Sequence, residues 1–450
     1  PGDSDPGERR GAALRLLHPL IAREPRAAPP QSDSCSPAAQ KLNWRVRLHG
    51  LSRTVPRGNF SLGTFFECGS ERLKTRPAGW VKMSEIVVAV MACFMVLGAA
   101  DKAIFSGRFG YGEEFEKGLG AMGPLSMSMV GIMCAAPSIG AFLGPALTPF
   151  FNAIGSDPSV AACMVLGVDS GGLPLALALA KTHEAAMLSG LGLGGSFGCI
   201  MTFALPISLS ICSEESRPDV ARGLVAGIIA APFSLFAVAA VMGYGFGDVL
   251  RLGLPAFAVA AILALLLTFC RDAAVRGCLL VGRLLMAAFV VLLACAAIEH
   301  WFSVTLIPGM APIGRQLEIV GEIGVLLSGA FPMVKFAERH FGGAIRGLAR
   351  LLRIDSTASL GMIVSIANPL PMYVTLNRMT PEGRVVCSAF SGPVLCLLGD
   401  HLGFITAAYP AGTIPMLAGK ILSALLALAI ALLLVRAGRG KRAETAASAA

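Results

Sequence analysis

Long apolar runs separated by short polar segments fill residues 84–435. About 20 apolar residues are needed to cross the ~30 Å hydrocarbon core of a bilayer. Segments of that order lie near residues 84–101, 119–136, 158–180, 185–212, 223–243, 252–270, 277–298, 317–334, 357–376, 385–409 and 413–435. The pattern predicts an all-α polytopic membrane protein with ten or eleven transmembrane helices, since one segment can be re-entrant.

Glycine and proline interrupt several of these runs, most clearly in VDSGGLP (168–174), LGLGGSFG (191–198) and ANPLP (367–371). Helix breaks at membrane depth are tolerated where the freed backbone is buried in protein or lines a cavity. Paired broken helices are the best pointer in a sequence to a transporter's binding site. We therefore expect the segments around 168–174 and 367–371 to face each other near the midplane.

The two halves of the chain align when one is shifted by 198 positions. The aligned pairs include Asp157 with Asp355, Glu184 with Glu382, Arg222 with Lys420 and, after one further residue of slip, Pro174 with Pro371. The shared order of segments predicts two related five-helix repeats, 84–243 and 282–435, joined by the span 252–270.

Loop charge bears on the orientation of these repeats. The loop 335–353 carries five Lys or Arg residues on an amphipathic pattern, whereas its counterpart 137–155 carries none. Basic loops lie on the cytoplasmic side, so the contrast indicates inverted repeats. A separation of six spans would preserve orientation, so inversion requires one re-entrant segment, and the sequence leaves this open.

Composition agrees with a membrane class, because 55% of the 450 residues are hydrophobic, only 14% are charged, and glycine is abundant at 52 residues. Small residues let helices approach closely in lipid. Residues 1–82 differ, with 14 Lys or Arg against 7 Asp or Glu, many prolines and serines, and no apolar periodicity. We expect a disordered basic leader outside the natural protein, which would begin at Met83; a tail that binds anionic lipid is the alternative.

The transporter domain is thus predicted at 83–435, followed by a short basic C-terminal tail at 436–450. Most cysteines are scattered singly in apolar runs, and no Cys/His cluster has the spacing of metal ligands. No nucleophile–base arrangement stands out either. We expect no metal, no cofactor and no enzymatic activity, and nothing indicates a nucleic-acid partner.

Ionisable side chains inside membrane segments are costly and mark functional sites. Asp169 lies in the first broken helix beside Ser170, and is either a helix cap or a counter-ion for a cationic substrate. Asp400 and His401 are adjacent in CLLGDHLGF (396–404), so a helix would point them about 100° apart. Asp400 would face a pathway, while His401 would bind a neighbouring carbonyl or carry a proton near neutral pH.

Two further positions complete the candidate site. Asn368, in the second broken helix, offers an amide that both donates and accepts hydrogen bonds. Glu318 lies near the start of its span behind Arg315, where an interfacial salt bridge is the alternative to substrate contact, and Glu322 lies one turn deeper. A set richer in carboxylates than in Lys or Arg favours a small cation as the substrate.

Five stretches resemble the ethanolamine-utilisation transporter family, EutH. They are FEKGLGAMGPLSMSMVG (115–131), VDSGGLPLA (168–176), LEIVGEIGVLLSGAFPMV (317–334), IANPLPMY (366–373) and LGDHLGF (398–404). The resemblance extends from Met83 to Val435. The chain departs from the family pattern at Glu322, at Pro369, in a shortened loop at 102–115 and in its leader.

The resemblance implies a multi-pass inner-membrane permease that brings ethanolamine into bacteria that catabolise it. Asp169, Glu318, Asn368, Asp400 and His401 carry over by motif, and Ser170 is added from its place beside Asp169. The departures leave room for another small amine or organic cation, and a structural membrane subunit is the rival from another class. Membrane lipids are the other expected partners, and whether the chain forms homo-oligomers is open.

Overall fold

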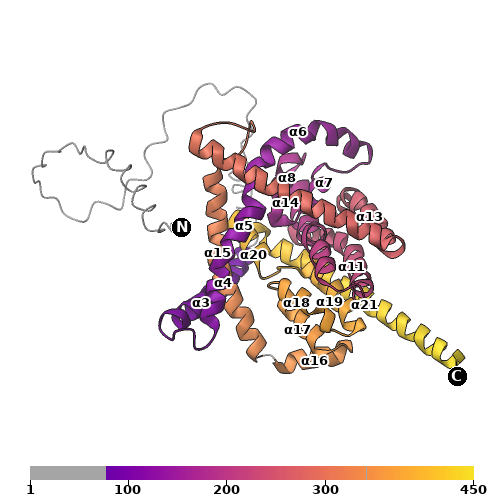
Figure 1. Ribbon diagram of the computed structural model, residues 1–450. Coiled ribbons are helices and arrows are strands. Elements are labelled where there is room, and N and C mark those ends of the chain that lie inside the picture. The colour runs from indigo at the N-terminus through magenta and orange to yellow at the C-terminus, as the bar shows by residue number, and fades with distance from the viewer. Residues whose placement is uncertain (1–77, 341, 450) are drawn as a thin grey trace, which may run out of the picture. The chain divides into compact units, whose positions relative to one another are not determined.

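The computed structural model describes residues 78–340 and 342–449, in which helices are joined by short loops and no strand occurs (Figure 1). Seven helices in this part of the chain are long and apolar enough to cross a membrane. They are Tyr111–Ala153, His183–Ile211, Arg217–Met242, Phe246–Phe269, Asp272–Phe302, Ile313–His340 and Pro410–Ala437. The prediction of an all-α polytopic membrane class is confirmed at this level.

The first half of the described chain is built from α3 to α12. Their bounds are α3 Ala78–Ala103, α4 Tyr111–Gly120, α5 Met122–Leu125, α6 Gly131–Ala153, α7 Ser159–Cys163, α8 Leu173–Leu179, α9 His183–Met187, α10 Leu205–Ile211, α11 Arg217–Ala230 and α12 Ser234–Met242. Wider π-helical turns at Ser126–Val130, Val168–Gly172, Leu188–Gly198 and Ile200–Ala204 lie between some of them, and a 3₁₀ turn at Ala231–Phe233 joins α11 to α12.

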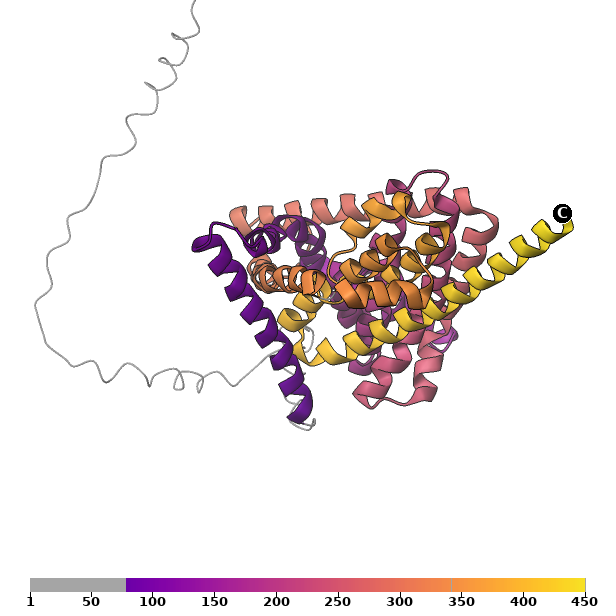
Figure 2. The same cartoon turned by 90° about the horizontal axis from the view of Figure 1, so that it is seen from below.

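The second half follows after α13, Phe246–Phe269. Its helices are α14 Arg271–Phe302, α15 Ile313–His340, α16 Gly342–Leu352, α17 Ser356–Ser365, α18 Leu370–Thr375, α19 Pro381–Val394, α20 Asp400–Ala408 and α21 Thr413–Ala449, with 3₁₀ turns at Leu376–Arg378 and Pro410–Gly412. Figure 2 shows α21 as the long yellow helix that ends at the C-terminus. The tail predicted from 436 therefore continues this helix as far as Ala449.

Three of the expected spans are divided into shorter helices. The span 158–180 splits into α7 and α8, 357–376 into α17 and α18, and 385–409 into α19 and α20. In the first of these, Gly171 has φ +99°, a conformation that glycine adopts without strain. The breaks at 168–174 and 367–371 fall where the sequence predicts them, whereas the break within 385–409 was not predicted. The break predicted at 191–198 is wrong, because these residues form a π-helical stretch inside the continuous helix His183–Ile211.

The helices pack in two groups. The scaffold helices are α3–α6, α14 and α15, with α3 and α4 against α15 and with α6 against α14. The core helices are α7–α12 and α17–α21, in which α11, α19 and α21 pack against one another (Figure 1). The groups meet where α6 contacts α8 and where α15 contacts α20. Residues 1–77, nearly all of the predicted leader, lie outside the described residues.

Candidate functional site

A cavity of about 1180 Å³ lies where the scaffold helices meet the core helices. The scaffold contributes apolar side chains such as Met286, Phe289 and Phe331 to its wall. The core contributes the polar ones, from the interruptions between its helices: Asp169, Ser170, Thr202, Asn368 and Asp400 all line it. The core wall therefore carries carboxylate, hydroxyl and amide groups, whereas the scaffold wall combines apolar side chains with the charged side chains of Glu114, Lys117, Arg283, Lys335 and Glu338.

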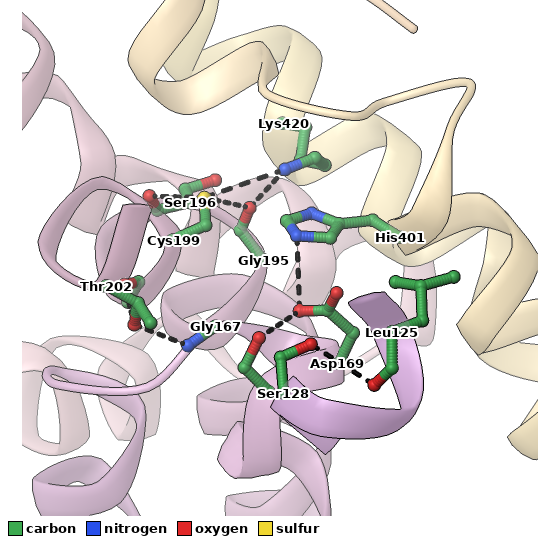
Figure 3. Close-up of polar contacts among 12 residues, drawn as sticks. Leu125, Ser128, Gly167, Asp169, Gly195, Ser196, Cys199, Thr202, His401 and Lys420 are labelled. Carbon is green, nitrogen blue, oxygen red and sulfur yellow. Dashed lines mark hydrogen bonds and ion pairs between the residues drawn. The ribbon is translucent and has the colours of Figure 1, made fainter. Parts of the chain in front are cut away.

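Asp169 anchors the polar wall from the π-helical turn before α8. Its side chain is 6% exposed, and its Oδ1 lies 3.4 Å from Nε2 of His401, which is itself 3% exposed (Figure 3). The Ser170 hydroxyl donates a second hydrogen bond to the same oxygen, at 3.1 Å. A buried carboxylate is costly unless it is paired or hydrogen-bonded, and here both partners come from residues that the sequence had singled out.

Asp400 and His401 point in different directions, as adjacent residues on a helix must. Asp400 is the first residue of α20, so its carboxylate lies at the positive end of that helix and also lines the cavity. His401 turns away from the cavity towards Asp169, and its Nδ1 has no hydrogen-bond partner among the described residues. Asp400 is thus available to a ligand in the cavity, while the imidazole of His401 pairs with the carboxylate of Asp169.

Asn368 has a structural task as well as a place on the cavity wall. Its Oδ1 accepts a hydrogen bond from the backbone N–H of Leu370 at 3.0 Å, which caps the start of α18. With the oxygen used in this way, the amide N–H₂ is the group that Asn368 can offer to a ligand. Thr202 accepts from the backbone N–H of Gly167 at 3.1 Å and so ties the turn before Asp169 to the π-helical stretch.

Glu318 is not brought to the cavity and contacts none of the other candidate residues. Its side chain is 57% exposed and forms an ion pair with Arg315 at 2.8 Å, three residues earlier on α15. This is the interfacial salt bridge that the sequence left open as the alternative. Glu322 is also exposed, and neither residue lines the cavity.

Four further charges line the cavity at the ends of α4 and α15. Lys117 pairs with Glu114 at 2.8 Å, and Lys335 approaches Glu338 to 4.0 Å. Because the Lys117 side chain is 60% exposed, this end of the cavity is open to solvent.

Lys420 is the residue that sequence reasoning missed. It lies in α21 with no exposed surface, and its ammonium group donates to the carbonyl oxygen of Gly195 (Figure 3). The signal was present, because a lysine eight residues into the apolar run 413–435 is as unusual as an aspartate there. No group of three or more His, Cys, Asp or Glu that could hold a metal ion occurs within the described ranges.

The cavity between two groups of apolar helices, with its polar groups on helix interruptions, defines a solute transporter of the multi-pass membrane class. The family model for the ethanolamine utilisation protein, EutH, matches residues 83–434, and the chain belongs to this family. Its apolar helices and its relatives identify it as a multi-pass protein of the bacterial cytoplasmic membrane, and the family is one of permeases, not enzymes.

Relatives from three bacteria carry the name probable ethanolamine permease EutH. The protein from Listeria monocytogenes is 34% identical over 78% of this chain and 94% of its own length. Those from Salmonella typhimurium and Escherichia coli are each 32% identical, over 82% and 78% of this chain and 99% and 96% of their own lengths. No solved structure matches the chain significantly.

Proposed function

We propose that this protein carries ethanolamine across the bacterial cytoplasmic membrane for its catabolism. The similarity to named ethanolamine permeases supports the substrate, and the cavity supports the transport. Ethanolamine is a compact ammonium with a hydroxyl group, so it needs an anionic partner and a hydrogen-bonding partner in a poorly solvated site. The cavity wall offers both.

The single observation that carries the proposal is that two carboxylates reach one polar wall while only one of them is paired. Asp169 is engaged by His401 and Ser170, which leaves Asp400 as the carboxylate available to an incoming ammonium. The amide of Asn368 and the hydroxyl of Thr202 line the same cavity and are the groups that suit the substrate hydroxyl. Glu318 has no part in this arrangement.

Uptake of labelled ethanolamine into membrane vesicles tests the proposal. The external pH is kept near 6, where passive entry of the neutral amine is small. Vesicles that contain the protein should show saturable uptake that exceeds the uptake of vesicles without it. Equal, non-saturable uptake in the two preparations would contradict ethanolamine transport. Competition by other small amines separates ethanolamine from the broader class of organic cations.

The two five-helix repeats are part of the proposal, because corresponding helices play corresponding structural roles. Asp157 accepts hydrogen bonds from Ser159 at the start of α7 and from the backbone N–H of Lys181 just before α9. Asp355 has the corresponding role in the second repeat. It accepts a hydrogen bond from the backbone N–H of Ala358 at the start of α17, and two more from the backbone N–H and the hydroxyl of Thr380 just before α19.

The order of the remaining helices supports the same reading. With a shift of 198 residues α3 falls on α14, α6 on α15 and α16, and α11 and α12 on α21. The contacts agree with this correspondence. In the first pair α3 packs on α15, and in the second pair their counterparts α14 and α6 pack on each other. The repeats account for ten segments and α13 for the eleventh.

A further inference from the structure

A buried lysine lies beside the substrate cavity without a carboxylate at salt-bridge distance among the described residues. Lys420 is in α21, and its ammonium donates to the Gly195 carbonyl and lies 3.8 Å from the Cys199 sulfur. Both partners belong to the π-helical stretch 188–204, whose wide turns loosen the regular backbone pattern. An ammonium has three N–H donors. Here its hydrogen-bond partners are neutral groups of an interrupted helix.

Two buried hydroxyls belong to the same two segments as Gly195 and Lys420. Those of Ser196 and Ser423 are 3.1 Å apart and completely buried; they bond to each other, whereas the ammonium itself contacts the Gly195 carbonyl and the Cys199 sulfur. A carbonyl oxygen and two hydroxyls are hard oxygen ligands of the kind that alkali-like and other hard cations prefer. The π-helical interruption supplies a backbone carbonyl at membrane depth, which is how unwound helices coordinate ions in transporters.

Lys420 lies close to the residues of the substrate site. Figure 3 shows Lys420 and His401 on the same side of Asp169. Arg222, which occupies the corresponding position of the other repeat, is exposed. The buried cation is therefore a feature of one repeat and is not required by the packing that the repeats share.

We propose that the Lys420 ammonium is a resident cation that fills a monovalent-cation site formed by the interrupted helix 188–204 and α21, so that transport needs no metal cation. The lysine stem lies over Gly195, whose Cβ position is 3.9 Å from the lysine Cγ, and so closes the site to ions. The proposed cation site is argued from the contacts of Lys420 alone. Its consequence, that transport needs no metal cation, rests also on the proposed transport function.

Removal of the side chain should open the site to Na⁺. In purified Lys420→Ala, Gly195, Ser196 and Ser423 keep their oxygens while the ammonium and its stem are lost. Lys420→Met is the matched control, because it fills the same volume without a charge. Thermal unfolding is measured in NaCl and in N-methyl-D-glucamine chloride at equal ionic strength, because this bulky cation fits the ethanolamine site poorly. We expect Na⁺ to raise the Tm of Lys420→Ala by several degrees in a saturable way, with no such shift in the wild type or in Lys420→Met.

Two results would overturn the proposal. One is a folded Lys420→Ala protein whose Tm does not respond to Na⁺, which would make the lysine a tether between helices and nothing more. The other is a saturable Na⁺ response in the wild type. If Lys420→Ala does not fold, ethanolamine uptake by the wild type decides: equal rates in Na⁺ and in the bulky N-methyl-D-glucamine support a resident cation, and stimulation by Na⁺ contradicts it. Absence of uptake in both salts would contradict the transport function; the Tm of the wild type then judges the site, since a saturable rise with Na⁺ contradicts the proposal and no rise supports it.

Discussion

At the scale of single residues, the sequence showed which ionisable side chains lie in membrane segments, but it did not show which side chains they contact. The adjacency of Asp400 and His401 predicted that they point apart, and the structure places one on the cavity and the other on Asp169. That Asp169 meets His401, 232 positions away, depends on how the core helices pack. Lys420 was missed for the same reason, since Gly195 is distant in sequence.

Replacement of Asp400 by asparagine should reduce ethanolamine uptake sharply without preventing folding. The amide keeps the size and most of the hydrogen bonding of the carboxylate but removes the charge. Loss of one partner of a buried ion pair costs about 3 kcal/mol, or roughly 100-fold in affinity. Glu318→Gln is the matched control, because Glu318 lies in an exposed ion pair away from the cavity, and it should transport normally. Wild-type uptake by Asp400→Asn at equal membrane abundance would leave Asp169 as the main counter-ion.

Replacement of His401 by glutamine should flatten the dependence of uptake on pH. Histidine changes its charge between about pH 5 and 8, and His401 is the imidazole that faces Asp169. Uptake rates are compared at several pH values in that range, with the exposed His300 replaced in a parallel variant. A profile for His401→Gln that matches the wild type would show that His401 does not exchange a proton during transport.

At the scale of elements, glycine and proline located the helix breaks, whereas local sequence could not show which breaks meet. The π-helical stretch 188–204 was visible only as a run of glycines, because its wide turns depend on close packing by other helices. Gly198 illustrates this, since a Cβ at that position would collide with the backbone carbonyl of Leu166. The correspondence of α7 with α17 was indicated by the aligned carboxylates Asp157 and Asp355.

Alanine at Asp157 or at Asp355 should destabilise the protein to a similar extent, because each carboxylate caps one broken helix and holds the next. Loss of a cap costs about 1 kcal/mol. The measurement is thermal unfolding in detergent. Glu214→Ala, at a 90% exposed side chain, serves as the control and should change the unfolding free energy by less than about 0.5 kcal/mol. A large effect at only one of the two aspartates would count against equivalent roles in the repeats.

The loss of thermal stability in Asp355→Ala should also depend on pH. Burial alone would raise the pKa of Asp355, but hydrogen bonds from Thr380 and from the Ala358 backbone outweigh it and lower the pKa below its ordinary value of 3.8. A carboxyl with a lowered folded-state pKa stabilises the protein above its unfolded-state pKa and loses that contribution as pH falls through the folded-state value. The Tm difference between wild type and Asp355→Ala should therefore be constant above about pH 5 and shrink below pH 4. A difference that does not shrink at all as the pH falls below 4 would assign the effect to packing.

At the scale of the whole molecule, hydropathy identified the membrane class, but it could not fix which way each segment crosses. We predict that the loops 335–353 and 137–155 lie on opposite faces of the membrane, from their opposite content of basic residues. Cysteines at Leu351 and Ile154, both exposed, are labelled with an impermeant maleimide after replacement of Cys35 and Cys68 and of the exposed Cys93 and Cys270. Labelling of Leu351→Cys from the cytoplasmic side and of Ile154→Cys from the outer side is expected. Labelling of both from one side would make the repeats parallel.

Counterflow with the purified protein tests the central claim most directly, namely that the cavity between scaffold and core helices carries ethanolamine by its ammonium. Proteoliposomes are loaded with unlabelled ethanolamine and diluted into labelled ethanolamine near pH 6. The account predicts transient, saturable accumulation of label that unlabelled ethanolamine outside suppresses and that ethylene glycol, which lacks the ammonium, does not. Accumulation no greater than in protein-free liposomes, or equal suppression by ethylene glycol, would contradict it.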